Sequence, residues 1–423
     1  MKDMKNIFNK ENTRGFENKT HLIKIISSTA VLCIFAVVGL LFFFRPDYSE
    51  NEKRNLTEFP KFTFEAFFSG EYFSQISLWY SDTYPLREPM IDANSSIQSI
   101  YGNREDQLII PSGGGDATVE NGGAVEQFGG IWIQNDTKTA YEIFYNRKSV
   151  NDRYIAAING AADKLGGAHV YNMVVPLHYT YKLTSEQISQ VGASDCVDVV
   201  DYIYSGLDDS VTAVDAHSQL MAHRDEYIYY RTDHHWTARG AYYAYVAFCQ
   251  AKGITPTPLE EYERVEFEGF LGTFYAQSNQ NKTLKDNPDY VEAFVPKGTN
   301  LLSAVTQSGD ETEYAVVYKG AGKYSAANKY LCFIGGDNPV SEIHNEKINN
   351  GSSIVVIKES YGNAFVPFLV DSYEYVYIID YRYFDGSLVD FVSENKIDDV
   401  LFLNYISTTS TESKIGQIEG IIE

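Results

Sequence analysis

The last hundred residues of the chain alternate between short apolar runs and longer amphipathic ones. Short apolar runs bounded by turn residues are typical of buried strands, and apolar positions three and four apart are typical of helices. The pattern predicts, in chain order, strand 330–334, strand 353–357, helix 363–370, strand 375–379, helix 386–394 and strand 399–403. Strands that alternate with helices in this way indicate an α/β fold with a mostly parallel sheet.

The same alternation extends toward the middle of the chain. It predicts helix 150–165, strand 168–176, strand 211–214, strand 227–230 and helix 238–251. Residues 255–330 follow no clear period and contain clusters of Asn, Lys, Asp and Gly, so we expect a β-rich insertion there. The domain that contains all these elements is predicted to run from residue 106 to residue 423.

One segment near the N-terminus has a different pattern. Residues 25–44 read IISSTAVLCIFAVVGLLFFF, without a charge, and about 20 apolar residues cross a hydrocarbon core of roughly 30 Å. Six basic and three acidic residues precede it, so we expect residues 1–24 in the cytoplasm and the rest of the chain outside the membrane. A cleaved signal peptide is the rival interpretation, although its apolar region would be shorter and end in small residues. A buried core helix is a third.

Residues 46–105, after this predicted transmembrane helix, are polar and aromatic. Within them Phe64, Phe67 and Phe68 fall near helical spacing, and so do Phe73 and Ile76. We therefore expect an amphipathic helix in this segment beside the membrane.

Composition excludes several classes of function. The chain has 423 residues, with 34 Lys and Arg, 57 Asp and Glu and a formal net charge of −23. Since affinity for nucleic acid depends on basic contacts with phosphates, this charge argues against a nucleic-acid partner. The four cysteines are too few for a disulfide scaffold, and those outside the apolar segment lack the close Cys or His neighbours of a zinc site. No glycine-rich phosphate loop is present, so neither a metal nor another cofactor is predicted.

Two short segments carry residues suited to nucleophilic catalysis. The segment RTDHHWT places Asp233, His234 and His235 between a predicted strand and a predicted helix. The segment IVVIKESYGN places Ser360 between a strand and the helix after it, at the end of the sheet where α/β folds bind ligands. A serine nucleophile needs a base, and the base needs a group that fixes its tautomer. Ser360, His235 and Asp233 are therefore a candidate triad.

These residues also have structural interpretations. Asp233 and Ser360 can cap the helices that follow them, and the two histidines can be ordinary hydrogen-bonded side chains. A metal site at His234 and His235 is a weaker possibility, because adjacent side chains on a strand point in opposite directions. A distance of about 3–4 Å between His235 Nε2 and Ser360 Oγ would favour catalysis, and about 8 Å would favour a binding protein.

Four blocks of the chain resemble the bacterial DHHW proteins. They are, in order, SENEKRNL followed by FP, SDTYPLRE, TDHHWT followed by GAYYAY, and IKESYGNAFVPFL. That family is similar to the SGNH-hydrolase-like domain of the alginate O-acetylation proteins. The resemblance implies an SGNH-hydrolase-like three-layer α/β sandwich outside the cytoplasmic membrane. By motif, the roles of aspartate, histidine and serine nucleophile fall on Asp233, His235 and Ser360.

The other candidate residues would bind substrate or stabilise an oxyanion. They are His234, Trp236, Tyr361, Gly362, Asn363 and His178. The separate glycine and asparagine blocks that build the usual SGNH oxyanion hole have no match in this chain. The donors would therefore have to be backbone N–H groups around Ser360–Gly362, together with Asn363.

These expectations lead to two functions of different class. The first is a membrane-anchored, extracytoplasmic O-acyltransferase or esterase that acts on cell-envelope polysaccharide. Its expected partners are that polysaccharide, the membrane and, as an acyl source, a membrane-bound donor protein. The second is a non-catalytic envelope protein that binds a glycan or a protein partner with the same cleft.

Overall fold

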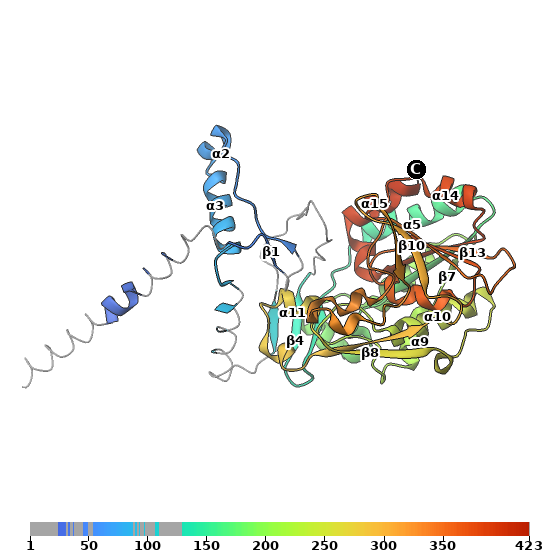
Figure 1. Cartoon of the computed structure of the whole chain (residues 1–423), viewed down its shortest axis with the longest axis horizontal. Helices are drawn as coiled ribbons and strands as arrows, with labels where there is room; N and C mark the ends of the chain where they lie inside the picture. Colours follow the sequence, from blue (N-terminus) through green and yellow to red (C-terminus); the bar gives the residue numbers. More distant parts are fainter. Residues whose placement is uncertain are drawn as a thin grey trace, which may run out of the picture. The chain divides into compact units, whose positions relative to one another are not determined.

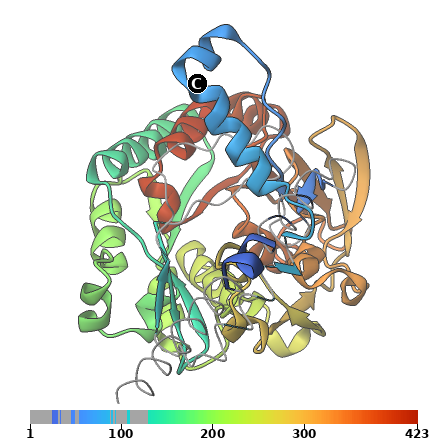
Figure 2. The ribbon, with the colours of Figure 1, turned by 90° about the vertical axis from the view of Figure 1, so that its left-hand side faces the viewer.

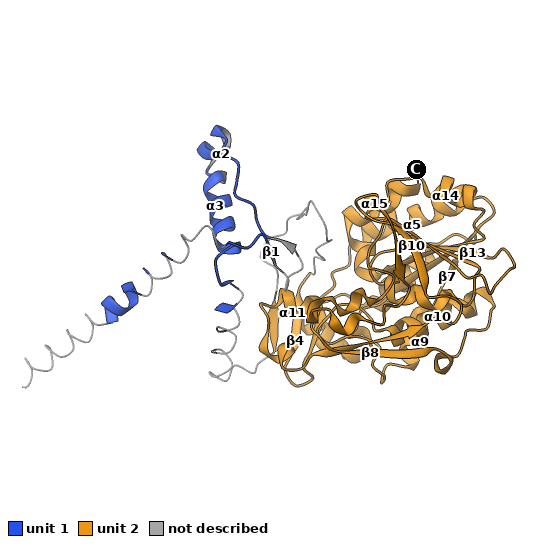
Figure 3. Cartoon of the chain, in the orientation of Figure 1, with its two compact units in different colours: residues 1–94 blue, residues 95–423 orange. Residues whose placement is uncertain are grey.

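The computed structural model describes residues 24–30, 33, 37, 45–49, 54–87, 89–90, 93, 97, 106–109 and 129–422. The chain divides into two compact units, residues 1–94 and residues 95–423 (Figure 3). None of the helices in the described ranges is long and apolar enough to cross a bilayer. The predicted cytoplasmic residues up to 23 and most of the predicted transmembrane helix, residues 25–44, lie outside those ranges. Both assignments stay predictions.

Two short helices lie in the part of the first unit described by residues 54–84. A small antiparallel ladder joins β1 (Tyr48–Ser49) to β2 (Arg54–Asn55), and α2 (Phe64–Ser69) and α3 (Glu71–Asp82) follow. The predicted amphipathic helix is thus two helices. Gly70 separates them, because its φ of 84° lies in the left-handed region that glycine adopts without steric cost.

One sheet of eight strands organises the second unit. In spatial order its strands are β11 (Glu311–Ala315), β10 (Leu301–Val305), β12 (Val340–His344), β14 (Tyr375–Asp380), β13 (Ser353–Lys358), β15 (Asp399–Tyr405), β6 (His169–Val175) and β7 (Val211–Ala213). The strands from β14 to β7 are parallel, whereas β11, β10 and β12 are joined antiparallel along one edge. The sheet is therefore mixed, and the expectation of a mostly parallel sheet is wrong in this respect. Two of the antiparallel strands come from the region 255–330, where the sequence follows no clear period.

Helices cover both faces of this sheet. One group is α5 (Lys148–Lys164), α14 (Leu388–Asn395) and α15 (Glu412–Ile422), and the other is α9 (Ala216–Ala222), α10 (Ala238–Lys252) and α13 (Gly362–Leu369). In β6, Asn172 accepts a hydrogen bond from Tyr154 of α5, whereas its neighbour Tyr171 packs on Phe248 of α10. Since successive strand residues point to opposite faces, the unit has three layers (Figure 1). Figure 2 shows α5 and α15 side by side on one of them.

Smaller elements surround the layers. Two further antiparallel sheets consist of β3 (Gln107–Ile109), β4 (Ile131–Gln134) and β5 (Thr139–Glu142), and of β8 (Glu263–Phe270) and β9 (Asp289–Val295). The short α-helices are α6 (Tyr179–Lys182), α7 (Ser185–Gln190), α8 (Cys196–Ser205), α11 (Thr273–Gln277) and α12 (Lys282–Lys285). The 3₁₀ helices are η2 (Leu259–Glu261), η3 (Ala321–Lys323), η4 (Ala326–Cys332) and η5 (Ile406–Ser410).

Two predicted strands are not formed. Residues 227–230 contribute only an isolated bridge between Tyr229 and Trp236. Residues 330–334 begin inside η4 and continue into a turn, where Ile334 and Gly335 have φ values of 45° and 68°. A short apolar run is compatible with a strand or with a buried helical turn, so the pattern alone does not separate them.

Candidate active site

Ser360 lies in the tight connection between the central strand β13 and helix α13. The strand ends at Lys358 and the helix begins at Gly362, so Ser360 stands at the carboxyl end of the parallel strands. A side chain at Gly362 would not fit, because its Cβ would lie 2.6 Å from the Cβ of Lys358. The glycine therefore allows the helix to begin directly after the strand.

The segment with Asp233 and His235 forms the loop before α10. Thr237 caps that helix by accepting a backbone N–H of its first turn at 3.2 Å. Asp233 therefore does not cap α10, and its Oδ1 accepts the N–H of His235 at 3.0 Å instead. The loop is also held by Asp289 of β9, whose carboxylate accepts the N–H of Thr232 at 2.7 Å.

The three candidate side chains meet as a chain of hydrogen bonds. His235 Nδ1 lies 2.6 Å from Asp233 Oδ1, and Ser360 Oγ lies 2.8 Å from His235 Nε2. The carboxylate fixes the imidazole proton on Nδ1, which leaves Nε2 to accept the serine proton. All three residues are buried, with exposed fractions of 3% for Asp233, 6% for His235 and 8% for Ser360. This arrangement can remove a proton from the serine hydroxyl.

Asp233 is held as a carboxylate. Burial alone would raise its pKa, but the neighbouring imidazoles of His235 and His234, with the hydrogen bonds from His235, lower that pKa well below its usual range. Its second oxygen, Oδ2, accepts the N–H of Thr273 at 2.7 Å and the Thr273 hydroxyl at 3.2 Å. This approach requires Gly272, because a Cβ there would lie 2.1 Å from Asp233 Oδ2. The carboxylate is therefore bonded on both oxygens.

Tyr330 contacts both His235 and Ser360. Its ring stacks on the imidazole of His235, with centroids 4.2 Å apart and planes 19° apart. Its hydroxyl donates to the backbone oxygen of Ser360 at 3.1 Å. A single side chain of η4 thus fixes the relative position of two residues that are 125 positions apart in the sequence.

Trp236 and Tyr361 connect the loop that holds His235 to the loop that holds Ser360. The indole Nε1 of Trp236 donates to the backbone oxygen of Tyr361 at 2.9 Å, and the Tyr361 hydroxyl donates to the backbone oxygen of His234. Both aromatic rings have an exposed fraction of 0%, which leaves no free ring face for a sugar. His234 is buried too, and its Nδ1 lies 2.7 Å from the hydroxyl of Thr273.

The backbone N–H groups that follow Ser360 are bonded within the turn. The N–H of Tyr361 donates to the carboxylate of Glu359 at 2.8 Å, and the N–H of Gly362 donates to the Glu359 carbonyl at 3.0 Å. The N–H of Asn363 donates to the carbonyl of Ser360 at 3.2 Å. An oxyanion would therefore have to compete with these bonds.

A network of buried charged side chains stabilises the turn that contains Ser360. Lys358 Nζ donates to Asp380 at 2.8 Å and to Asp337 at 3.0 Å. Burial lowers the pKa of Lys358, but the two carboxylates outweigh burial and raise it. Arg382 completes the network, and the Asn363 side chain donates to Asp337 at 2.9 Å. The start of α13 is thereby bonded to the loop that holds Asp337.

His178 lies between aromatic rings. Its ring is 5.0 Å from the rings of Tyr141 and Tyr229, and it stacks on Tyr229 with an interplanar angle of 10°. Burial, with a smaller contribution from Lys182, lowers the pKa of His178 to about 3. His178 is therefore an uncharged packing residue at neutral pH.

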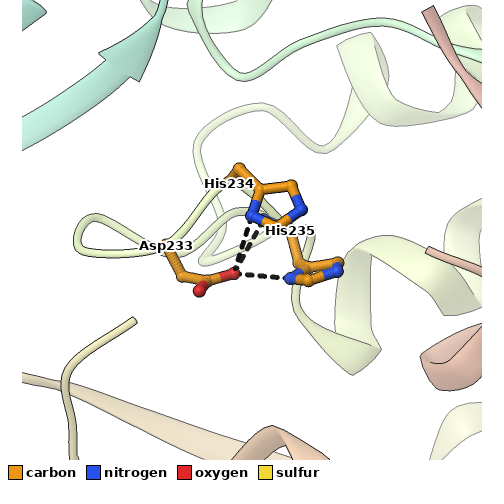
Figure 4. A group of neighbouring side chains, drawn as sticks. All are labelled: Asp233, His234 and His235. Carbon is orange, nitrogen blue, oxygen red and sulfur yellow. Dashed lines mark hydrogen bonds and ion pairs between the residues drawn. The ribbon is translucent and has the colours of Figure 1, made fainter. Parts of the chain in front are cut away.

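Asp233, His234 and His235 are the group in the described part of the chain that could hold a metal ion (Figure 4). Four-coordinate ligands about 2.0–2.2 Å from zinc lie roughly 3.4 Å from one another. The distance of 3.6 Å from His234 Nδ1 to Asp233 Oδ1 suits that geometry, but the 2.6 Å from His235 Nδ1 to the same oxygen is that of a hydrogen bond. The group therefore fits proton transfer better than metal binding.

Thr273 and Tyr330 are site residues that the sequence patterns do not reveal. Both come from the region 255–330, which has no period and whose contacts with the loop depend on the fold. The one local signal is Gly272 within the apolar segment GFLGTF, since an isolated glycine there often marks a close backbone approach.

The protein is therefore an α/β protein whose mixed sheet has a buried Ser-His-Asp cluster at the carboxyl end of its parallel strands. The chain belongs to the DHHW protein family, whose profile matches residues 52–116 and 111–379. No curated protein sequence matches it.

Solved structures agree with that family. A DHHW family protein from Eubacterium siraeum is 31% identical with a TM-score of 0.60, over 67% of this chain and 93% of that chain. The structure of Bacillus cereus PatB1 with a sulfonyl adduct is 18% identical with a TM-score of 0.56, over 68% of this chain and 97% of that one. The chain thus shares its fold with both proteins.

Proposed function

We propose that this chain is an SGNH-hydrolase-like O-acyltransferase or esterase, anchored in the cytoplasmic membrane, that acts on cell-envelope polysaccharide outside it. One observation carries the chemistry: Ser360 Oγ lies 2.8 Å from His235 Nε2, and His235 Nδ1 lies 2.6 Å from buried Asp233. A serine hydroxyl is a weak nucleophile until a base takes its proton. Here the base is present and its tautomer is fixed.

The proposed reaction begins with transfer of the acyl group to the enzyme. Ser360 Oγ forms a bond with the carbonyl carbon of an acetyl ester, its proton passes to His235 Nε2, and the carbonyl electron pair moves onto oxygen. Asp233 stabilises the imidazolium. When the electron pair returns, the ester C–O bond breaks and the leaving alcohol takes the proton from Nε2.

The second half of the reaction frees the serine. A sugar hydroxyl or water attacks the acetyl-serine carbonyl and gives its proton to His235 Nε2. The bond between the acetyl carbon and Ser360 Oγ then breaks, and Oγ recovers the proton from Nε2. The product is an O-acetylated sugar in the first case and acetate in the second.

We infer the location of the protein and the class of its substrate from the sequence. The apolar segment 25–44 and the basic residues before it favour an anchored chain with its second unit outside the membrane. The resemblance to the alginate O-acetylation proteins favours polysaccharide as the acceptor. A membrane-bound acyl donor protein would bring the acetyl group to that side.

The second candidate is a non-catalytic envelope protein that binds a glycan or a protein partner. One observation favours it: the N–H groups of Tyr361, Gly362 and Asn363 are bonded within the turn. Loss of one oxyanion donor typically costs about 10²–10³ in rate. The two candidates differ in whether Ser360 reacts.

Reaction of the purified chain with phenylmethylsulfonyl fluoride, followed by intact-mass measurement, tests the proposal. The sulfonyl adduct on PatB1, which has a similar fold, makes this reagent a suitable probe. We expect a single adduct on the wild type and none on Ser360→Ala. We also expect Ser360→Ala to lower hydrolysis of p-nitrophenyl acetate by at least about 10³-fold.

Ser205→Ala is the matched control, because Ser205 is exposed at the end of α8; it should keep both the adduct and the hydrolysis. An adduct of equal yield on Ser360→Ala would contradict the assignment of the nucleophile. A wild-type chain that takes no adduct and hydrolyses no ester, yet binds envelope glycan, would establish the second candidate.

A further inference from the structure

The first unit carries a dense patch of exposed phenylalanine. The side chains come from the segment before α2, from α2 and from the start of α3. Their exposed fractions are 54% for Phe62, 74% for Phe64, 38% for Phe67, 81% for Phe68 and 56% for Phe73. We refer to these five residues as the aromatic corner. Soluble surfaces rarely expose so much contiguous apolar area unless it contacts a partner or a membrane.

The aromatic corner is an ordered cluster and not a set of isolated side chains. Phe67 lies at its centre, with ring centroids 5.7 Å from Phe62, 5.5 Å from Phe68 and 5.2 Å from Phe73. Phe64 packs edge-on against Phe62 at 5.5 Å. The rings therefore present one continuous apolar surface, in which each side chain has an exposed fraction of at least 38%.

The other end of α3 is bonded to the residue that follows the predicted transmembrane helix. Arg45 donates to the hydroxyl of Thr83 at 2.7 Å and to the backbone oxygen of Tyr80 at 3.3 Å. Its guanidinium lies over the rings of Trp79 and Tyr80, at 4.1 and 5.0 Å from their centroids. Trp and Tyr are enriched at both membrane–water interfaces, and Arg is among the residues that anchor helices there.

Distance along the helix connects these two features. From Trp79 back to Phe73, α3 advances about 9 Å, at 1.5 Å per residue. The interfacial layer on each side of a bilayer is roughly 5–8 Å thick. We take Arg45 to mark the point where the chain leaves the membrane. An α3 that stood upright would then carry the aromatic corner beyond the interfacial layer, whereas an α3 that lies along the surface keeps the aromatic corner within it.

We infer that α2 and α3 form an interfacial hairpin that lies on the outer surface of the cytoplasmic membrane, with the aromatic corner inserted among the lipid headgroups and upper acyl chains. The occupant of the apolar surface is thus the phospholipid bilayer. This inference rests on the proposed anchor but not on the proposed chemistry. Its consequence is that the chain is held at the membrane by a hairpin as well as by a transmembrane helix.

Depth measurement with a nitroxide label tests the inference on the full chain in vesicles of phosphatidylcholine and phosphatidylglycerol. The label goes on Phe68→Cys in a Cys33→Ser background, because Cys196, Cys249 and Cys332 are buried. Its collision rates with oxygen, which concentrates in lipid, and with a water-soluble nickel chelate report its depth. Ser210→Cys, exposed in the polar turn before β7, is the control, and a label on native Cys33 reports the anchor.

We expect the label at position 68 to collide with oxygen at least threefold more than the label at position 210 does, and with nickel at least threefold less. Equal nickel collision at both positions would overturn the inference. Protection from both reagents, or dipolar broadening between copies, would also overturn it, because the aromatic corner would then contact protein. A lipid-exposed Cys33 with a water-exposed position 68 would reject the hairpin and keep the anchor. Phe64→Cys repeats the test if Phe68→Cys does not fold.

Discussion

Tyr330 stacks on His235 and bonds to the backbone of Ser360, so it acts on both ends of the proposed proton transfer. An aromatic face beside an imidazolium contributes about 0.5–2 kcal/mol when desolvated. We therefore expect Tyr330→Leu to lower kcat/KM for p-nitrophenyl acetate about 10-fold. Tyr330→Phe keeps the ring and should lose less.

Comparison of the two Tyr330 variants separates a positioning role from a structural one. Loss of packing alone would reduce thermal stability and the amount of active enzyme, but not kcat/KM per folded molecule. An unchanged kcat/KM in folded Tyr330→Leu would therefore contradict a role for the ring in the reaction.

His178 makes stability depend on pH. Burial lowers its pKa to about 3 in the folded chain, whereas the imidazole of an unfolded chain titrates near 6.5. Between pH 6.5 and about pH 3 the unfolded state gains this proton and the folded state does not. The free energy of unfolding therefore decreases as the pH falls. We expect the wild type to lose about 2 kcal/mol more free energy of unfolding than His178→Gln between pH 7 and pH 5, measured by urea denaturation at both values. Equal losses in the two chains would contradict this prediction.

At the residue scale the sequence reveals groups that are close to one another along the chain. Asp233 and His235 are two positions apart, and Ser360 stands between a recognisable strand and helix, so each can be proposed from its own segment. Thr273 and Tyr330 approach them only through tertiary contacts. Likewise, the sequence makes Trp236 and Tyr361 candidates for substrate binding, but both are buried and connect the two loops.

Residues 255–330 form several elements whose side chains and backbone hold the loop with Asp233 in place. β9 supplies Asp289, which holds the loop at Thr232, and α11 begins with Thr273, which bonds to Asp233. Gly272 makes the second contact possible, because a Cβ there would overlap the carboxylate. This irregular region therefore forms one wall of the site.

Gly272→Ala tests the importance of that wall. The added methyl group must displace Asp233 or the backbone of α11, and a displacement of about 1 Å can cost 10²-fold in rate. We expect at least that loss in p-nitrophenyl acetate hydrolysis. Gly322→Ala in the same region is the matched control, because its Cβ would meet only Phe267, at 3.8 Å. Full activity in Gly272→Ala would show that the contact between α11 and Asp233 is dispensable.

At the element scale, prediction succeeds where a single chain segment contains the whole signal. The strand and helix series from β13 to β15 follows the apolar pattern, because each parallel strand is buried on both faces. The antiparallel edge does not follow it. β10 alternates between exposed and buried positions and pairs with β11 and β12, so its place in the sheet depends on partners outside the segment. Three layers can be predicted, but the direction of the edge strands cannot.

At the scale of the whole molecule, Asp233, His235 and Ser360 all belong to the second unit, residues 95–423. Their described supports Thr273 and Tyr330 belong to it as well. This unit also has its own core, built from the sheet and both helix layers. The aromatic corner and the predicted transmembrane helix belong to the first unit. Chemistry and membrane attachment are thus assigned to different parts of the chain.

This division predicts the behaviour of a chain that lacks residues 1–94. Because the first unit supplies none of the triad and none of its described supports, we expect residues 95–423 to fold cooperatively and to hydrolyse p-nitrophenyl acetate within about twofold of the full chain. The same fragment should not sediment with phospholipid vesicles, whereas the full chain should. Circular dichroism, turnover and sedimentation on one preparation measure all three. A folded fragment without turnover would mean that the first unit contributes to the site, and a fragment that still sediments would place a membrane-binding surface on the second.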